Sequence, residues 1–231
     1  MKKLGLIGGT GPESTIEYYR QIVYGVQKRT GNFPNLTVES LSVFDVLNFC
    51  DRADYKGLVQ YLLHGVQRLS NAGADFACLT GITPHIVYNE FAAQSPIPIV
   101  SMIESACEYA RTKCYTKLAL LGTYPTMSGN FIQKAFSAYN IEILTPPENE
   151  MRYIGEKIET ELELAQVIPE TQRRFCEIVT RLAEKEQVQA IVLGCTELPT
   201  ILNQNLSPVP CLDVMKIHID KLISMILKEQ W

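Results

Sequence analysis

Short runs of apolar residues alternate along this chain with longer amphipathic stretches. Buried strands of a parallel sheet produce such apolar runs, and the crossover helices between them produce the amphipathic segments. We expect strands over residues 2–8, 37–44, 75–81, 97–101, 116–122, 140–145, 189–194 and 208–213. We expect the main helices over residues 13–29, 55–72, 101–113, 150–164, 170–186 and 213–228. The alternation predicts an α/β protein with parallel sheets.

The pattern also repeats itself once. The stretch KLGLIGG at 3–9 returns as KLALLGT at 117–123, which is 114 residues later. ACLTGIT at 77–83 falls on IVLGCTE at the same offset. SPIP reappears as SPVP after a similar interval, each time before an expected helix. Three matches in the same order indicate two similar halves.

Two similar halves imply two α/β domains. We place the first over residues 1–98 plus 210–231 and the second over residues 99–209. Parallel α/β sheets bind ligands beyond the carboxyl ends of their strands. We therefore expect the loops GGTG, LTGIT, GTYPT and GCTE to surround one cleft between the domains, where the repeat sets Gly81 opposite Cys195.

The composition argues against several classes of protein. Of the 231 residues, 46% are hydrophobic and 20% are charged, which is enough apolar material for a large core. The net charge of −4, without a block of like charges, argues against a nucleic-acid or polybasic membrane partner. The first apolar run is too short for a signal peptide, and no run of about 18 apolar residues follows it.

The cysteines indicate the compartment. Seven cysteines at scattered positions fit a reducing environment rather than a disulfide framework, so we expect a cytoplasmic protein. No C-x-x-C motif occurs and only three histidines are present, so a metal site is not expected.

Two threonine- and glycine-rich turns are candidate ligand sites. In LIGGTGPEST, backbone N–H groups can hold a carboxylate or phosphate, although a tight turn without a ligand fits equally well. The stretch lacks the lysine of a phosphate-binding loop, and Ser14 replaces the last glycine of a dinucleotide-binding motif. In LLGTYPTMS, Thr123 and Thr126 either bind a small carboxylate or cap the next helix, and capping is favoured.

Cys195 is the strongest candidate for chemistry. It follows an apolar strand and a glycine, and TEL after it begins a helix. A helix N-terminus lowers the pKa of a thiol and favours the reactive thiolate. The alternative is a small buried hydrophobic residue, which is the common role of free cysteine. We interpret the cysteines in strands or helix bodies as packing residues: Cys78, Cys107, Cys114, Cys176 and Cys211.

Other titratable residues have an ordinary structural alternative. His85, near a helix start, either tunes a proton transfer or bonds to backbone groups, and His218 is interpreted as structural. The cations available to bind an anion are Arg52, Arg152 and Lys157, for each of which a solvated surface position is favoured.

The stretches GLIGGTGPESTIEYY, LLGTYPTM, LGCTEL and LDVMKIH resemble, in order and over nearly the whole chain, the cofactor-independent aspartate/glutamate racemase family. The resemblance implies two α/β domains related by a pseudo-twofold axis, an active site in the cleft between them, and a homodimer. It also implies a mechanism without pyridoxal phosphate or metal. One cysteine thiolate removes the α-proton, and a second thiol returns a proton to the other face. Cys195 corresponds to the second family cysteine.

The first family motif is incomplete in this chain. C-N-T-x-H falls on GITPH, where Thr83 and His85 match, but Gly81 and Ile82 replace the cysteine and the asparagine. A glycine has no side chain with which to exchange a proton. Some family members carry a threonine at or near this position, so we expect Thr83, or else Thr80, to act as the second catalytic group.

The loops are expected to bind a small amino acid or dicarboxylate. Hydroxyls and backbone amides would hold the carboxylate, where negative charge develops, and Glu197 or a cation would read the α-amino or side-chain group. The residues expected to contact substrate are Thr10, Arg52, Gly81, Ile82, Thr83, Thr123, Thr126, Thr196 and Glu197. Glu163 lies where some family members have a carboxylate-binding lysine, which leaves the identity of the substrate open.

Two other functions remain as alternatives. A single cysteine facing a glycine also resembles the arylmalonate decarboxylase-like enzymes, in which one cysteine protonates an enediolate after CO2 leaves. The other alternative is a catalytically impaired binder of dicarboxylates or amino acids. Under the racemase hypothesis, the substitution Gly81→Cys is expected to raise two-way racemisation.

Overall fold

The computed structural model describes residues 1–229 and 231, which form two compact units. Unit 1 consists of Met1–Met102 and His218–Trp231, and unit 2 consists of Ile103–Ile217. The chain passes between the units inside two helices, α5 (Met102–Thr112) and α11 (Val214–Leu227). The boundaries expected at 98/99 and 209/210 fall before these crossings, because both helices continue the chain past the last strand of a sheet.

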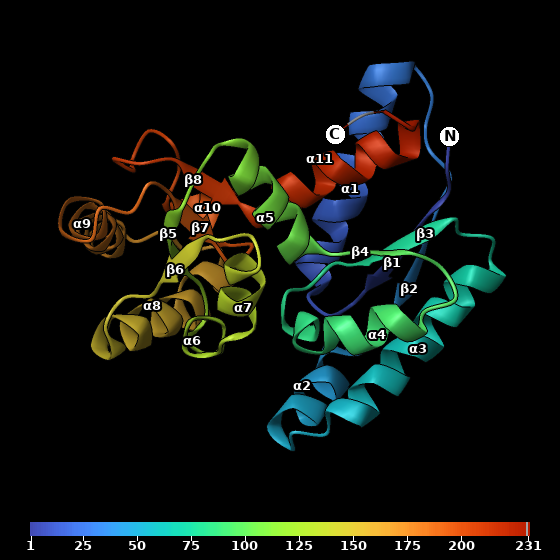
Figure 1. The fold of residues 1–231 in the computed structure, drawn as a ribbon, viewed down its shortest axis with the longest axis horizontal. Helices are drawn as coiled ribbons and strands as arrows, with labels where there is room; N and C mark the ends of the chain where they lie inside the picture. The colour runs from blue at the N-terminus through green and yellow to red at the C-terminus, as the bar shows by residue number, and fades with distance from the viewer. Residues whose placement is uncertain (230) are drawn as a thin grey trace. The chain divides into compact units, whose positions relative to one another are not determined.

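Unit 1 is built on a four-stranded parallel sheet of order β2-β1-β3-β4. Its strands are β1 (Leu4–Gly8), β2 (Leu36–Ser40), β3 (Phe76–Leu79) and β4 (Ile99–Val100). Its helices are α1 (Pro12–Thr30), α2 (Val43–Asp51), α3 (Tyr55–Asn71), the 3-10 helix η1 (Thr83–Val87) and α4 (Tyr88–Gln94), with most of α11. Figure 1 shows α3 and α4 on one side of this sheet and α1 and α11 on the other.

The apolar faces of these elements meet in the core of unit 1. Ile7 of β1, Leu62 of α3 and Phe91 of α4 belong to one buried cluster. On the other side of the sheet, a Cβ placed on Gly25 of α1 would lie 2.5 Å from Cδ1 of Ile223 in α11. The absence of a side chain at position 25 therefore permits the close packing of these two helices.

The C-terminal helix is tied into unit 1 by hydrogen bonds as well. The backbone N–H of Lys2 donates to the carbonyl of Ile226 over 2.9 Å. His218 is fully buried, with its Nε2 3.2 Å from the carbonyl oxygen of Val100 and its Nδ1 2.7 Å from the hydroxyl of Tyr18. Since a carbonyl only accepts, Nε2 carries the hydrogen and Nδ1 accepts from Tyr18.

Unit 2 has a second four-stranded parallel sheet of order β6-β5-β7-β8. Its strands are β5 (Lys117–Leu121), β6 (Glu142–Leu144), β7 (Ile191–Leu193) and β8 (Cys211–Asp213). Its helices are α6 (Tyr124–Ser128), α7 (Phe131–Ser137), α8 (Glu148–Thr160), the 3-10 helix η2 (Leu162–Leu164), α9 (Pro169–Lys185) and α10 (Leu198–Ile201), with most of α5.

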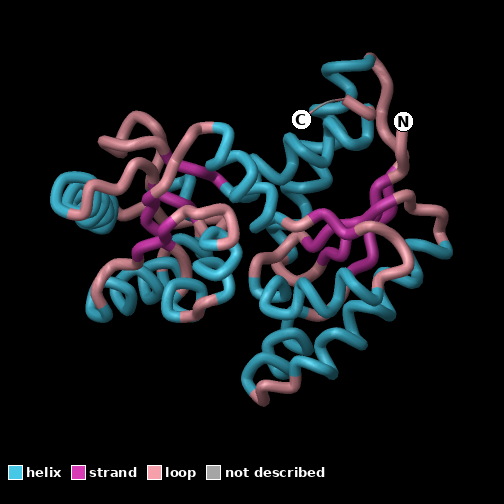
Figure 2. Tube along the Cα trace, in the orientation of Figure 1, coloured by secondary structure: helices cyan, strands magenta, loops and turns pink. Residues whose placement is uncertain are grey.

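The two sheets repeat one topology. In each, the first strand along the chain lies between the second and the third, and the fourth follows the third at the edge. Figure 2 shows the strands gathered into two separate sheets with helices around each. The α/β class and the two similar halves predicted from the repeat are confirmed.

One expected strand was too long. Residues 37–44 were predicted as a strand, but β2 ends at Ser40 and Val43 begins helix α2. The side chain of Ser42 accepts the backbone N–H of Asp45 over 3.3 Å, which caps the helix. This local capping bond outweighs the β propensity of Val43 and Phe44.

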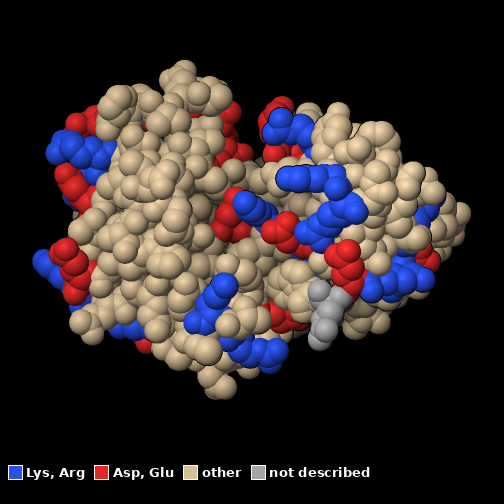
Figure 3. Space-filling model, turned by 90° about the horizontal axis from the view of Figure 1, so that it is seen from above, with Lys and Arg blue, Asp and Glu red and all other residues tan. Residues whose placement is uncertain are grey.

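The surface carries charges of both signs. Figure 3 shows Lys and Arg side chains interspersed with Asp and Glu on the face that it presents. On α9, Arg173 pairs with Glu170 at 2.5 Å and with Glu177 at 3.0 Å. Across the described part of the chain, no helix has both the length and the apolar character that a membrane crossing requires.

Candidate active site

The first half-site lies in unit 1, where two loops leave the carboxyl ends of β1 and β3. Thr10 follows β1 between Gly9, with φ 77°, and Gly11, with φ 151°. Both values are in the region that favours glycine, so the GGTG pattern is needed to form the turn. Gly81 lies in the second loop, two residues after the end of β3.

Three hydroxyls near these loops are committed to the backbone. Ser14 donates to the carbonyl of Thr80 over 2.6 Å, and Thr15 donates to the carbonyl of Gly11 over 3.0 Å. Thr80, which is fully buried, donates to the carbonyl of Ile7 over 3.2 Å. Thr80 therefore joins β3 to β1, and the structure does not support it as the second catalytic group.

Thr10 and Gly81 approach each other closely. A Cβ placed on Gly81 would lie 2.8 Å from both the carbonyl oxygen and Oγ1 of Thr10. Real Cβ atoms do not approach other heavy atoms this closely, so any side chain at position 81 would displace Thr10. Oγ1 of Thr10 is buried and has no hydrogen-bond partner among the described residues.

His85 bonds to the backbone rather than facing outward. Its Nε2 accepts the N–H of Met102 over 3.2 Å, and its Nδ1 donates to the carbonyl of Gly81 over 3.1 Å. Burial lowers the pKa of His85 to about 4, so the ring is neutral at physiological pH. Thr83 is exposed at the start of η1, and Ile82 before it is half-buried.

The second half-site lies in unit 2, beyond the carboxyl ends of β5 and β7. Thr123 occupies the N-cap position of α6, but its side chain does not cap the helix. Its Oγ1 lies 2.9 Å from Oγ1 of buried Thr126, so the capping expected for Thr123 was wrong. The N–H of Gly194 donates to the carbonyl of Leu121 over 2.7 Å and holds the two loops together.

Cys195 lies in the second of these loops, directly against a carboxylate. Its Sγ donates to Oε2 of Glu197 over 2.8 Å. The hydroxyl of Thr196 donates to Oε1 of the same carboxylate over 2.8 Å. The three consecutive residues therefore form one hydrogen-bonded group, with Glu197 as its acceptor.

The thiol of Cys195 is held in its protonated form. Burial raises the pKa of Cys195 well above its usual value, and the negative charges of Glu197 and, less strongly, Glu163 add to this effect. The lowered pKa expected from a helix N-terminus was wrong. Helix α10 has only four residues, and desolvation and the nearby carboxylates outweigh its dipole.

Glu163 adds to the acidic character of this half-site. Burial raises its pKa, and the charges of Glu197 and Glu159 raise it further. Two carboxylates, Glu163 and Glu197, therefore act on Cys195, and the first of them stands where some family members have a carboxylate-binding lysine.

The three cations considered for anion binding have no described contact with the loops of Gly81 and Cys195. Arg52 is exposed at the C-terminal end of α2, and no described hydrogen bond or ion pair joins it to another side chain. Arg152 pairs with Glu148 at 2.6 Å, and its guanidinium lies 4.7 Å from the centre of the Tyr124 ring. Lys157 forms a 2.6 Å ion pair with Glu161, the residue after α8.

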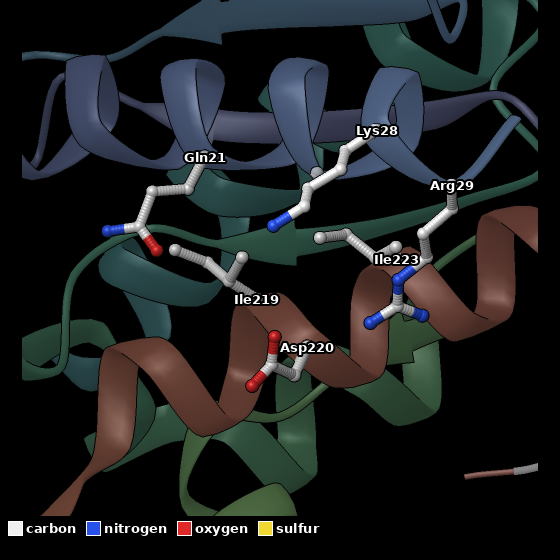
Figure 4. Close-up of a pocket in the computed structure, with 7 residues that line it drawn as sticks. Gln21, Lys28, Arg29, Ile219, Asp220 and Ile223 are labelled. Carbon is white, nitrogen blue, oxygen red and sulfur yellow. The ribbon is translucent and has the colours of Figure 1, made fainter. Parts of the chain in front are cut away.

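Two hollows in unit 1 were not expected from the sequence. One, of about 440 Å³, adjoins the turn after β1 and is lined by Gly9, Pro12, Thr15, Ile16, Ser40, Leu41, Ser42, Val43 and Phe44. The sequence pointed to residues 40–44 only as a strand, so it gave no signal for this surface. The other hollow, of about 490 Å³, lies between α1 and α11 (Figure 4). Its lining includes Lys28, Arg29 and Asp220 and none of the expected site residues.

The chain is similar to known racemases over most of its length. A family model described as Asp/Glu/Hydantoin racemase matches residues 7–222. The broad specificity amino-acid racemase RacX of Bacillus subtilis (strain 168) is 20% identical over 213 residues, which cover 91% of this chain and 92% of that protein.

Solved structures show the same fold. An aspartate racemase homologue from Pyrococcus horikoshii OT3 has a TM-score of 0.88 at 28% identity, covering 98% of this chain and 100% of that one. Arylmalonate decarboxylase has a TM-score of 0.56 at 12% identity, covering 97% and 92%. The second likeness concerns the fold alone.

Proposed function

The chain belongs to the Asp/Glu/hydantoin racemase family, and we propose that it is an amino-acid racemase that works by thiol-mediated α-proton transfer. Cys195 is the principal acid and base of this reaction. The observation that carries the proposal is the contact of its thiol with Glu197, at the carboxyl end of a parallel strand.

The contact with Glu197 gives the thiol a route for its proton. To remove an α-proton, Cys195 must first lose its own, and the carboxylate 2.8 Å away is placed to accept it. To return a proton, the thiol is already in the required state, because its pKa is raised. The paired hydroxyls of Thr123 and Thr126, with the loop amides of unit 2, would hold the substrate carboxylate.

The charge of the second half-site bears on the substrate. Aspartate and glutamate are the first substrates to consider, as in the family to which the chain belongs. Glu163 and Glu197, however, repel a second carboxylate near Cys195 and attract an ammonium group. The assay therefore includes both enantiomers of aspartate, glutamate, alanine and lysine.

The test follows the α-proton signal of each amino acid by proton NMR in D2O, with chiral chromatography of the same samples. The wild-type protein is expected to exchange the α-proton and to convert one enantiomer into the other. Cys195→Ala is expected to abolish both, while Cys176→Ala, which removes a thiol from α9, leaves them unchanged. Full retention of exchange in Cys195→Ala would refute the proposal.

The raised pKa of Cys195 also favours a second candidate, a one-sided decarboxylase or isomerase. Such an enzyme needs only a protonated thiol to deliver a proton to an enediolate, and no group at position 81. CO2 release from an aryl- or alkylmalonate that depends on Cys195, without exchange of any amino acid, would establish it. Ligand-induced thermal stabilisation that survives Cys195→Ala, without turnover, would instead indicate a binder.

The expected assembly rests on the family resemblance, and the expected location rests on the seven scattered cysteines. We expect a homodimer in the cytoplasm, and sedimentation equilibrium over a range of protein concentrations tests the first expectation. A single species at the mass of one chain would contradict it.

A further inference from the structure

We propose that the hydroxyl of Thr10 is the second proton-transfer group of this enzyme, in place of the side chain that Gly81 lacks. The inference rests on the racemase function proposed above, because a racemase needs an acid/base in addition to Cys195. Its basis is the geometry of the two loops of unit 1.

The first observation is that positions 10 and 81 share the space of one side chain. A Cβ on Gly81 would lie 2.8 Å from Oγ1 of Thr10, which places the hydroxyl beside the first atom that a cysteine at position 81 would add. The absence of a side chain at position 81 therefore leaves the space that the side chain of Thr10 occupies. The chain has a polar group at this place, but a neighbouring loop supplies it.

The second observation is that Oγ1 of Thr10 is buried without a partner. A buried hydroxyl normally donates and accepts, and leaving it unpaired costs about 1–3 kcal/mol. By contrast, the nearby hydroxyls of Ser14, Thr15 and Thr80 all donate to backbone carbonyls. Thr10 thus keeps a free donor at the end of β1.

Two other candidates for the role fit less well. Thr83 is exposed at the start of η1, so water competes for its hydroxyl. Cys78 is fully buried within β3, and burial raises the pKa of its thiol far above the usual range. Neither adjoins the Cβ position of Gly81 as Thr10 does.

The turn also fixes the position of Thr10. Gly9 and Gly11 hold left-handed backbone angles on either side of it. A Cβ on Gly9 would lie 2.1 Å from the carbonyl oxygen of Leu41, so the backbone there is tightly enclosed. A hydroxyl on such a turn is held in place without a hydrogen bond of its own.

The proton balance is simple. The Cys195 thiolate takes the α-proton, and the electron pair of the broken C–H bond spreads into the substrate carboxylate. The O–H bond of Thr10 then breaks as a new C–H bond forms at the α-carbon, and the threonine alkoxide regains a proton from water. Cys195 passes the proton that it took to Glu197, from which it neutralises the hydroxide so formed. The opposite direction reverses each step. Because a hydroxyl is a weaker acid than a thiol, turnover is slower than in a two-thiol enzyme.

The test uses Thr10→Val, which removes the hydroxyl but keeps the shape, with Thr10→Ser as the conservative variant and Thr83→Val as the test of the rival hydroxyl. Each enantiomer is incubated separately in D2O. In Thr10→Val, we expect one enantiomer to exchange its α-proton through Cys195 with retention, while the other does not exchange. Inversion is expected to fall at least about 100-fold, as is typical for loss of a general acid or base. Thr10→Ser is expected to keep inversion within about tenfold of wild type.

Three results would overturn the proposal. Inversion at the wild-type rate in Thr10→Val would show that Thr10 takes no part in the reaction. Loss of inversion in Thr83→Val would assign the role to Thr83. An equal slowing of exchange for both enantiomers in Thr10→Val would show that Thr10 only binds substrate. If wild type exchanges no amino acid at all, the racemase function itself has failed. Thr10→Ala makes the same deletion and serves if Thr10→Val does not fold.

Discussion

Among single residues, Cys195 shows how a neighbouring charge sets the state of a reactive group. Its side chain is half-buried, and its hydrogen-bond acceptor is an anion two residues further along the chain. A carboxylate in this place stabilises S–H over the thiolate, so the resting enzyme has an acid ready and must form its base. The rate of the reaction should therefore rise as the pH increases.

Removal of the Glu197 charge is expected to lower the pKa of Cys195. In Glu197→Gln, alkylation of Cys195 by iodoacetamide at pH 7.5 should be faster by about tenfold, which corresponds to about one pKa unit. The measurement is the alkylation rate of the peptide containing residue 195, followed by mass spectrometry. Glu163→Gln is the control and should have a smaller effect, because Glu163 contributes less to the shift. An unchanged or slower rate in Glu197→Gln would contradict this account.

The Gly81→Cys substitution is expected to destabilise the protein rather than improve it. The sequence alone favoured a gain in racemisation, but the added Cβ would lie 2.8 Å from Thr10. Overpacking of this kind costs about 1–3 kcal/mol of unfolding free energy. Urea denaturation of Gly81→Cys and Gly81→Ala measures it, and equal losses in the two variants would assign the cost to the Cβ. A Gly81→Cys protein as stable as wild type, with faster inversion, would show that Thr10 yields easily.

The sequence was informative about Cys195 and uninformative about its partners. A strand, a glycine and a polar turn mark the carboxyl end of a parallel strand, and that local pattern found the residue. Which way the side chain of Glu197 turns is a rotamer choice that no local pattern contains. The approach of Thr10 to Gly81 joins loops some 70 residues apart in the sequence, so it exists only once β1 and β3 have paired.

At the scale of elements, His85 connects three of them. It lies in η1, donates to the loop after β3 and accepts from the first residue of α5, where the chain leaves unit 1. Both bonds require a neutral ring with its hydrogen on Nδ1. A single side chain thus holds the loop of Gly81 and the start of the crossing helix in one arrangement.

The neutrality of His85 makes stability depend on pH. Burial lowers its pKa to about 4, against 6.5 in an unfolded chain. Between these values the unfolded chain binds a proton that the folded chain excludes, so the unfolding free energy falls as pH falls through this window. The loss from pH 7 to pH 4 amounts to roughly 3 kcal/mol. In His85→Gln, the loss of unfolding free energy between pH 7 and pH 4 should be smaller than in wild type by about 3 kcal/mol. Urea denaturation of both proteins at pH 7, 5.5 and 4 measures the difference. Parallel pH profiles for the two proteins would refute the role of His85.

Strands were easier to predict than short helices. Within the described residues, the eight strands lie near the expected positions. The central strands β1, β3, β5 and β7 are buried apolar runs, whereas the edge strands β2 and β6 carry polar and partly exposed residues. The start of helix α2 was misassigned because Val43 and Phe44 have high β propensity and continue the run of strand residues, although Ser42 caps a helix there. Such a bond depends on one side-chain geometry, which periodicity does not reveal.

At the scale of the whole molecule, the two units are unequal in how the chain forms them. Unit 2 is continuous from Ile103 to Ile217, whereas unit 1 needs a second segment from His218 onward. The repeat predicted two halves, with the C-terminal residues belonging to the first of them. The crossings were placed too early because the repeat ends in the strands, and the helices that follow them cross between the units.

Removal of residues 218–231 is expected to unfold unit 1 selectively. The segment buries four large apolar side chains, Ile219, Leu222, Ile223 and Ile226. At about 1.5–3 kcal/mol each, their loss removes roughly 6–12 kcal/mol, which is comparable with the stability of a whole domain. Hydrogen exchange followed by mass spectrometry should show β1 and β3 deprotected while β5 and β7 stay protected. Equal protection of both sheets in the truncated protein would contradict the prediction.

The divided unit 1 has a consequence for the order of events during synthesis. Its sheet is translated first, yet the helix that covers one side of that sheet is translated last, after the whole of unit 2. On the ribosome, the apolar side awaiting Leu222 and Ile226 is without its cover while more than a hundred further residues emerge. Over this interval the nascent chain exposes an apolar sheet face of the kind that chaperones protect, and the half translated second can be completed before the half translated first.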